Sequence, residues 1–175
     1  MDKLFDNLYS IEIPKLKFGE QELVWEINDD FFGHFEKPLV QVAVIRIAGT
    51  VTKYETHVDA IFRLTGSIQL ECDRCTEEYM QPVNATRRVI FAYNENLRDD
   101  NEDVILVDPS EDVIHLAPEF YDFIHLEVPI RKVPESSVHE CPPAILETLE
   151  KIKNTHEGEM DPRWEALREL KKKKQ

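Results

Sequence analysis

The feature that most restricts the fold of this 175-residue chain is a long central stretch in which apolar and polar residues alternate. Val40, Val42 and Val44 begin the pattern, and a second run extends from Val58 to Cys72. A two-residue period places the apolar side chains on one face of a β-strand. Serial strands of this kind, joined by short turns, predict an antiparallel meander with one buried face.

Turn-forming residues and β-branched runs predict the other strands. Thr65-Gly66-Ser67 predicts a hairpin turn inside the second run, and residues 83–93 predict a further strand. Residues 8–27 predict two short early strands, and residues 104–107 predict a late one. The predicted fold is therefore α+β: an antiparallel β-sheet meander with short helices and a C-terminal helical tail.

Prolines and capping residues predict where the helices begin. Pro118 suits the first turn of one helix, and Pro142-Pro143 precede an amphipathic second helix. Asp161-Pro162 supply an N-cap followed by proline at the first helical position. We therefore expect one domain over residues 1–155, followed over residues 156–175 by a linker and a basic helix.

The charge of the chain is distributed unevenly. The net charge is −14, but residues 163–174 hold six basic residues against two acidic ones, a local +4, so the remainder carries −18. An acidic body repels phosphate at long range, which favours a basic protein partner and confines any RNA contact to local basic patches. The candidate residues for contact with RNA or a partner are Arg74, Arg87, Arg88, Lys171, Lys172, Lys173 and Lys174. Arg74 has an alternative role, because it could instead pair with Glu71 or Glu77.

The sequence contains neither a secretion signal nor a membrane segment that we can recognise. The first six residues lack a basic region followed by an apolar core, and no apolar run approaches the roughly 20 residues that a membrane span needs. Three cysteines also argue against a secreted disulfide framework. We therefore expect a cytoplasmic protein with reduced thiols and no contact with membranes.

Cys72 and Cys75 form a C-x-x-C motif at the end of a predicted strand. Two thiols at this spacing can hold one metal ion or form one redox pair. A structural zinc site needs four tetrahedral ligands, and the remaining candidates are His139 and Cys141. Such a site would tie the irregular segment 134–143 to the sheet.

Two other interpretations of the cysteines remain open. The pair could belong to a thiol oxidoreductase, although thioredoxin-like proteins place the motif between a strand and a helix, and Glu77-Glu78 would disfavour a thiolate here. Alternatively, Cys72 continues the apolar side of its strand and could be a buried, inert residue. The histidines are scattered, and no hydrolase, phosphate-loop or dinucleotide fingerprint is present, so we assign no catalytic residue.

Several segments resemble one known family in the same order. Residues 66–79 resemble the C-x-R-C-(L)-E-(P)-F signature of the YceD family, the large ribosomal RNA subunit accumulation proteins, formerly a domain of unknown function. Residues 123–129 resemble its apolar stretch, residues 134–141 its proline, histidine and cysteine segment, and residues 161–170 its terminal (D/N)PR-aaLkkL helix. The resemblance covers about residues 10 to 172.

The resemblance implies a non-enzymatic ribosome-biogenesis factor that supports the synthesis, processing or stability of 23S rRNA. The implied partners are a large-subunit precursor, 23S rRNA or a basic ribosomal protein. The chain departs from the family pattern at Thr76, where leucine is usual, and at Glu78, where proline is common. Zinc is the candidate cofactor, and the alternative functions are a zinc-stapled protein-interaction module and a thiol oxidoreductase that uses the C-x-x-C pair.

Overall fold

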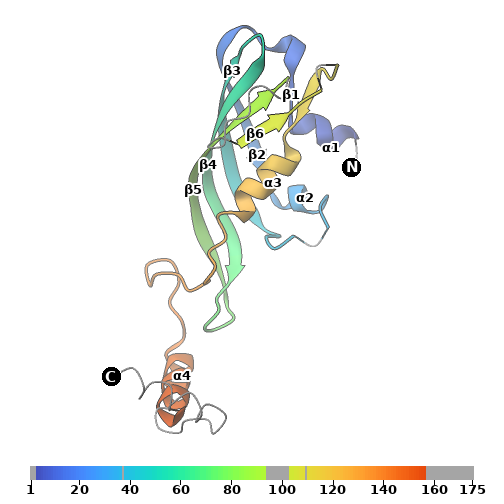
Figure 1. Cartoon of the computed structure of the whole chain (residues 1–175). Coiled ribbons are helices and arrows are strands. Elements are labelled where there is room, and N and C mark those ends of the chain that lie inside the picture. Colours follow the sequence, from blue (N-terminus) through green and yellow to red (C-terminus); the bar gives the residue numbers. More distant parts are fainter. Residues whose placement is uncertain (1–2, 37, 94–102, 109, 157–175) are drawn as a thin grey trace, which may run out of the picture.

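The computed structural model describes residues 3–36, 38–93, 103–108 and 110–156. A five-stranded sheet in the order β2-β3-β4-β5-β6 forms the body, and β1 pairs with β7 beside it (Figure 1). The strands are β1 (Ser10–Glu12), β2 (Gly19–Ile27), β3 (Ala43–Lys53), β4 (His57–Glu71), β5 (Glu78–Ala92), β6 (Asp103–Leu106) and β7 (Val113–His115). The helices are α1 (Lys3–Leu8), α2 (Asp29–Phe32), α3 (Ala117–His125) and α4 (Pro143–His156), with a 3₁₀ turn at Ile13–Lys15.

The pairing of β2 through β5 is antiparallel in sequence order, which confirms the predicted α+β fold. The fifth strand differs from a simple meander, because β6 runs parallel to β5 with Val89 opposite Asp103. The short β7 was not predicted, and its three residues are too few to show an alternation.

One face of the sheet carries the core. α1, α2 and α3 lie on this side (Figure 1), and aromatic rings fill the space between the layers. Trp25 from β2, Phe62 from β4 and Phe120 from α3 meet edge to face, with ring centroids 5.3 to 5.9 Å apart. Burial of one such side chain stabilises the fold by about 2–3 kcal/mol, so this cluster fixes α3 on the sheet.

The predicted hairpin turn at Thr65-Gly66-Ser67 is wrong, because β4 continues through it without interruption. Gly66 has a φ of +152° and lies opposite Ile45 of β3. A Cβ atom at this position would lie 2.0 Å from the carbonyl oxygen of Val44. The glycine therefore permits a close approach of two strand backbones, a role that has the same sequence signal as a turn.

The β4–β5 hairpin extends beyond the rest of the sheet. Pairing of β3 with β4 starts at Ala43 and Ile68, whereas β5 follows β4 to the last pair, Glu71 and Glu78. β5 therefore begins before the predicted residue 83 and passes through Pro82. The alternation of the ladder turns the nitrogen of Pro82 away from β4, and β6 pairs only with later residues of β5, so no ladder hydrogen bond is lost.

The chain after α3 continues as an irregular segment to Pro142, as predicted, and then forms α4. α4 lies away from the body, beyond the tip of the β4–β5 hairpin (Figure 1). Its predicted apolar side is largely exposed at Leu149 and Ile152, while Ile145 and Leu146 are partly buried against the core. The predicted terminal helix and Lys171–Lys174 lie outside the described residues. Among the described helices, none combines the length and apolar character needed to cross a membrane.

Replacement of Gly66 by alanine tests the close approach of β3 and β4. We expect Gly66→Ala to lower the free energy of unfolding by about 3 kcal/mol or more, because the new methyl group meets backbone atoms and the positive φ strains it. Gly33→Ala is the control, since Gly33 has a φ of −62° and its nearest atom lies 3.4 Å away. Urea denaturation of both variants measures the difference; equal losses would contradict this explanation.

Candidate metal centre

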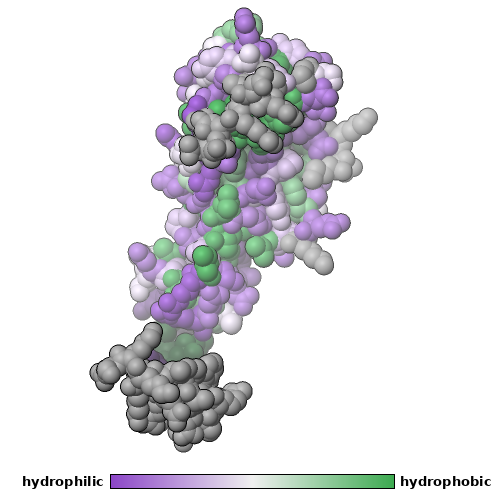
Figure 2. All heavy atoms as spheres, in the orientation of Figure 1, coloured by the Kyte–Doolittle hydropathy of each residue, from purple (hydrophilic) through white to green (hydrophobic). Residues whose placement is uncertain are grey.

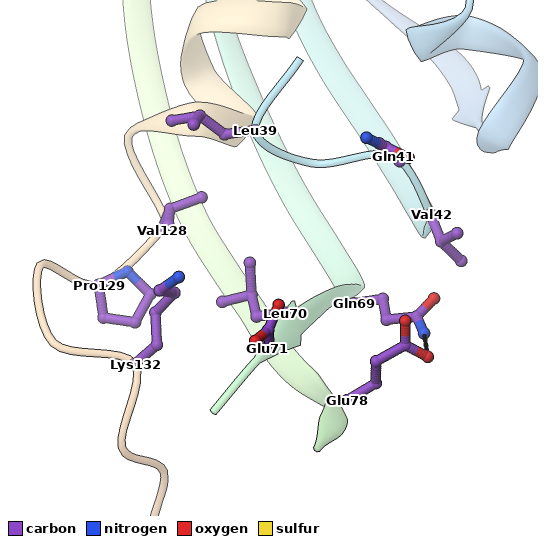
Figure 3. A pocket seen from close by; sticks show the side chains of 10 residues that line it. All are labelled: Leu39, Gln41, Val42, Gln69, Leu70, Glu71, Glu78, Val128, Pro129 and Lys132. Atoms are coloured by element: carbon purple, nitrogen blue, oxygen red, sulfur yellow. Dashed lines mark hydrogen bonds between the residues drawn. The ribbon is translucent and has the colours of Figure 1, made fainter. Parts of the chain in front are cut away.

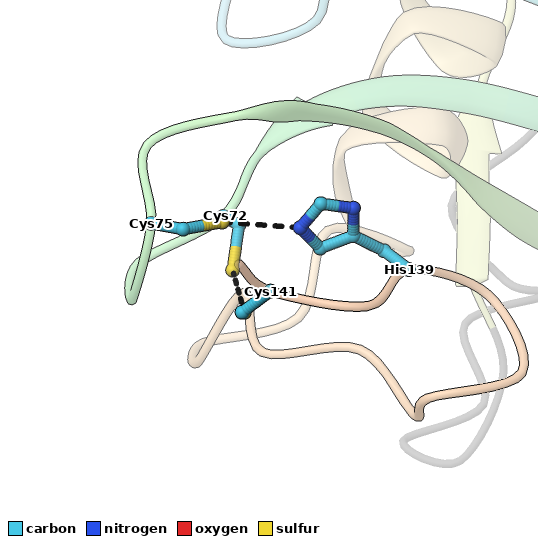
Figure 4. A group of neighbouring side chains, drawn as sticks. All are labelled: Cys72, Cys75, His139 and Cys141. Carbon is cyan, nitrogen blue, oxygen red and sulfur yellow. Dashed lines mark hydrogen bonds between the residues drawn. The ribbon is translucent and has the colours of Figure 1, made fainter. Parts of the chain in front are cut away.

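Two segments that are distant in the sequence bring four potential metal ligands together (Figure 4). Cys72 and Cys75 lie in the turn between β4 and β5, and His139 and Cys141 lie in the irregular segment before α4. Their sulfur and nitrogen atoms all lie within 4.8 Å of one another. The four residues proposed from the sequence thus form one cluster.

The separations within the cluster suit tetrahedral coordination. The sulfur atoms of Cys72 and Cys141 are 3.7 Å apart, and Cys75 Sγ lies 3.1 Å from His139 Nε2. A Zn–S bond of about 2.3 Å implies about 3.8 Å between two sulfurs of a tetrahedron. A small divalent cation therefore fits between the four atoms with only minor adjustment of the side chains.

Backbone hydrogen bonds shape the turn that carries the first two cysteines. The amide of Cys72 donates to Glu77 O at 2.9 Å, and the amide of Thr76 donates to Cys72 O at 2.9 Å. This closure places Thr76 at a φ of +61°, a left-handed conformation that β-branched residues rarely adopt. The turn therefore positions two thiols close together at a cost in backbone strain.

Polar contacts next to the cluster hold the two segments together independently of any metal. The amide of Asp73 donates to Lys132 O at 2.9 Å, and the amide of Lys132 donates to Asp73 Oδ2 at 2.7 Å. The ammonium group of Lys132 also lies 3.5 Å from Asp73 Oδ1. This reciprocal pair joins the irregular segment to the hairpin tip several residues before His139, and so limits where the later ligands can lie.

The cluster is closed to solvent. The exposed fractions of Cys72, Cys75 and Cys141 are 1%, 5% and 8%, and that of the His139 side chain is 12%. The ring of Tyr79 stacks on His139 with their centroids 5.8 Å apart. Structural metal sites are closed in this way, whereas catalytic sites keep one coordination position open.

The thiols differ in how easily they ionise. Burial raises the pKa of Cys72, but hydrogen bonds from the amides of Arg74 and Cys75 and from the neighbouring thiols outweigh burial and hold that pKa below its usual value. Burial, followed by contact with Cys75 and Cys72, raises the pKa of Cys141 to about 11. Without a cation the three thiols cannot all be thiolates at neutral pH, and a divalent metal would supply the missing positive charge.

The arginines proposed for RNA contact do not form one surface. Arg87 points to the core side of β5 and pairs with Glu127 at 2.5 Å, while Arg88 points to the opposite side and pairs with Asp59 at 2.9 Å. Arg74 is exposed in the turn, and within the described segments it pairs with neither Glu71 nor Glu77.

Tyr79 forms part of the wall of the cluster. Only 5% of its surface is exposed, and its ring covers His139, so it is not available to stack on a base. Burial raises the pKa of Tyr79, and its hydroxyl has no hydrogen-bond partner in the described part of the protein. Tyr79 could have been identified from the sequence, because it occupies the aromatic position of the cysteine signature, whereas no sequence pattern indicates the Asp73–Lys132 pair.

Comparison with known families identifies the family of the chain. Residues 61–171 match the family described as "Large ribosomal RNA subunit accumulation protein YceD". The chain belongs to the YceD family. The matched region includes all four members of the cluster, and the description of the family connects it with large-subunit ribosomal RNA and names no reaction. Searches of curated proteins and of solved structures each found no match.

Thr76 provides a test of strain in the cysteine turn. We expect Thr76→Gly to leave stability unchanged or to raise it by up to about 1 kcal/mol, because glycine adopts a positive φ without a Cβ clash. Thr86→Gly, on the exposed side of β5, should instead lower stability by about 1 kcal/mol. Thermal unfolding of the two variants compares them, and equal destabilisation would argue against strain at Thr76.

Proposed function

We propose that this YceD family protein is a non-enzymatic factor in biogenesis of the large ribosomal subunit, and that it supports the accumulation of 23S rRNA in the cytoplasm. The family match supports the connection with ribosomal RNA. The closed cysteine–histidine cluster supports the absence of catalysis at this site, because a buried four-ligand set leaves no open position for a substrate.

We further propose that Cys72, Cys75, His139 and Cys141 bind one structural zinc ion. One observation carries this proposal: four atoms of the types that zinc prefers converge within 4.8 Å, although the Cys72–Cys141 pair spans 69 residues. Thiolate sulfur and imidazole nitrogen suit zinc better than calcium or magnesium, which bind oxygen.

The zinc would act as a staple for the C-terminal part of the protein. α4 begins two residues after Cys141, and only two of its apolar side chains are partly buried against the core. Few other contacts therefore fix this helix, so a metal at its start would decide its position relative to the hairpin. Burial of both thiols of the motif also disfavours a thiol oxidoreductase, and so does their position in a turn between two strands, because thioredoxin-like proteins place the motif between a strand and a helix.

The acidic charge of the protein supports a basic partner. A net charge of −14 attracts a basic ribosomal protein, or an intermediate in which such a protein is bound to rRNA, and opposes direct contact between the body and RNA. In this proposal Lys171, Lys172, Lys173 and Lys174 contact RNA while the body holds the protein component.

Metal analysis tests the staple. Purified protein should contain about one zinc per chain, and chelation should lower its melting temperature. His139→Gln should weaken zinc binding by at least about 100-fold, whereas the exposed His115→Gln should leave it unchanged. Absence of zinc, together with a melting temperature that chelation does not change, would refute the staple, and disulfide exchange by Cys72 and Cys75 would favour the oxidoreductase.

Ribosome analysis tests the cellular role. Deletion of the gene should reduce free large subunits and mature 23S rRNA on a sucrose gradient, while small subunits accumulate normally. The wild type and His115→Gln should restore the large subunit, and His139→Gln should restore it less well because α4 loses its anchor. Unaltered subunits after deletion would refute the proposed function.

A further inference from the structure

A groove lies beside the hairpin tip, on the side where β3 begins (Figure 3). Its volume is about 440 Å³. Three segments form its walls: the chain before β3, the paired ends of β4 and β5, and the chain after α3. The lining residues are Leu39, Gln41, Val42, Gln69, Leu70, Glu71, Glu78, Val128, Pro129 and Lys132.

The groove contains an unused backbone donor. Alternate residues at the end of β4 and just after it direct their backbone amides away from β5: Gln69 N donates to Val42 O, and Asp73 N, two residues beyond β4, donates to Lys132 O, both at 2.9 Å. Glu71 lies between these two residues and faces the same side, and its amide has no partner in the described segments. A ligand with a carbonyl group could accept this hydrogen bond.

The rim of the groove is apolar and exposed. Of the lining residues, Leu39 is 76% exposed and Val42 is 37% exposed. Two apolar residues of the segment that contributes Val128 and Pro129 are also exposed: Leu126 at 68% and Ile130 fully. Figure 2 shows apolar side chains gathered in a narrow patch on a largely hydrophilic face. The rim is also held in place, because the Leu39 amide donates to His125 Nε2 at 3.2 Å. An exposed apolar patch on a fixed backbone is typical of an interaction surface.

The floor of the groove carries negative charge that is not neutralised within the described residues. Glu71 and Glu78 lie directly opposite each other on β4 and β5, an arrangement that destabilises a hairpin by up to about 1 kcal/mol. The side-chain Nε2 of Gln69 donates to Glu78 Oε2, and Lys132, the one cation of the lining, is already paired with Asp73. A cation from a partner would relieve this repulsion.

We infer that the groove binds an extended segment of a basic protein in which a branched aliphatic residue is next to lysine or arginine. The aliphatic side chain would lie against Leu39, Leu70 and Val128, and the basic side chain would reach Glu71 and Glu78. A main-chain carbonyl of the segment would accept the Glu71 amide. This inference rests on the basic partner of the proposed function and assigns the surface that receives it.

The same features disfavour RNA as the occupant of the groove. Two carboxylates on the floor repel phosphate, and the lining holds no aromatic side chain on which a base could stack. Binding of RNA in the groove would therefore overturn the inference.

Fluorescence anisotropy with purified, zinc-loaded full-length protein provides the test. The probe is a labelled nonapeptide of alternating lysine and valine, and the control peptide carries glutamate in place of lysine. Leu39→Asp and Glu71→Lys should each weaken binding of the lysine peptide by about tenfold or more. The control variants Leu8→Asp in α1 and Glu22→Lys in β2 carry the same changes at exposed positions away from the groove. They should weaken binding of the lysine peptide less than about twofold.

Amide hydrogen exchange gives a second readout that general charge attraction would not change. The lysine peptide should slow exchange of the Glu71 amide by about tenfold, with no change for the control peptide. The inference is overturned if the four variants lose affinity equally, if the Glu71 amide is unaffected, or if a uridine oligonucleotide binds in the groove in place of the peptide. Zinc content of each variant is measured so that a damaged metal site is recognised.

The two proposals can fail separately. If the peptide does not bind while deletion still reduces 23S rRNA, the groove assignment is wrong and the proposed function stands. If the peptide binds as expected but deletion leaves the large subunit unchanged, the groove stands and the ribosomal role is wrong.

Discussion

The contact between the tip of the β4–β5 hairpin and the segment before α4 determines the position of the described chain that follows α3, up to His156. The sheet and its helical layer are held by a conventional aromatic core, whereas α4 has little buried apolar surface of its own. What holds it is a small polar contact, the Asp73–Lys132 pair, and the cluster of three thiols and one imidazole. A metal bound at the cluster would stabilise this small contact, because the free energy of metal binding would take the place of the missing apolar interface.

The same hairpin tip explains both the ligand cluster and the groove. β4 and β5 extend past Ala43, the first residue of β3, so the last residues of β4 have a paired strand on one side only. The turn at the end of this overhang presents Cys72 and Cys75 to the downstream segment. On the open side, the Glu71 amide faces the groove and has no partner among the described residues. A β3 that began several residues earlier would fill the groove, so the late start of β3 creates the candidate binding surface.

The sequence predicted those parts of the structure that depend on local pattern or on ligand chemistry. Alternation located β3, β4 and β5, and the demand of zinc for four soft ligands selected His139 and Cys141 as partners of the C-x-x-C pair. Prediction from the sequence failed where the structure of a segment depends on contacts with distant segments. Gly66 has the local signal of a turn but is required by the backbone of β3. Residues 104–107 predicted the strand β6, but nothing in them predicted its parallel pairing with β5. The groove was also not predictable, because it arises from the absence of a neighbouring strand.

The distribution of charge links the metal centre to the groove. The structure uses Arg87, Arg88 and Lys132 in internal ion pairs, so the excess of carboxylates is left exposed and includes Glu71 and Glu78 at the hairpin tip. Glu71 directly precedes the ligand Cys72 in the sequence, and Asp73 directly follows Cys72. Lys132, on the wall of the groove, contacts Asp73. The floor and one wall of the groove are thus continuous with the ligand turn. A metal that fixes this turn would also fix the spacing of the two carboxylates, and a basic segment bound between them would stabilise the turn in return, since linkage between two sites is reciprocal.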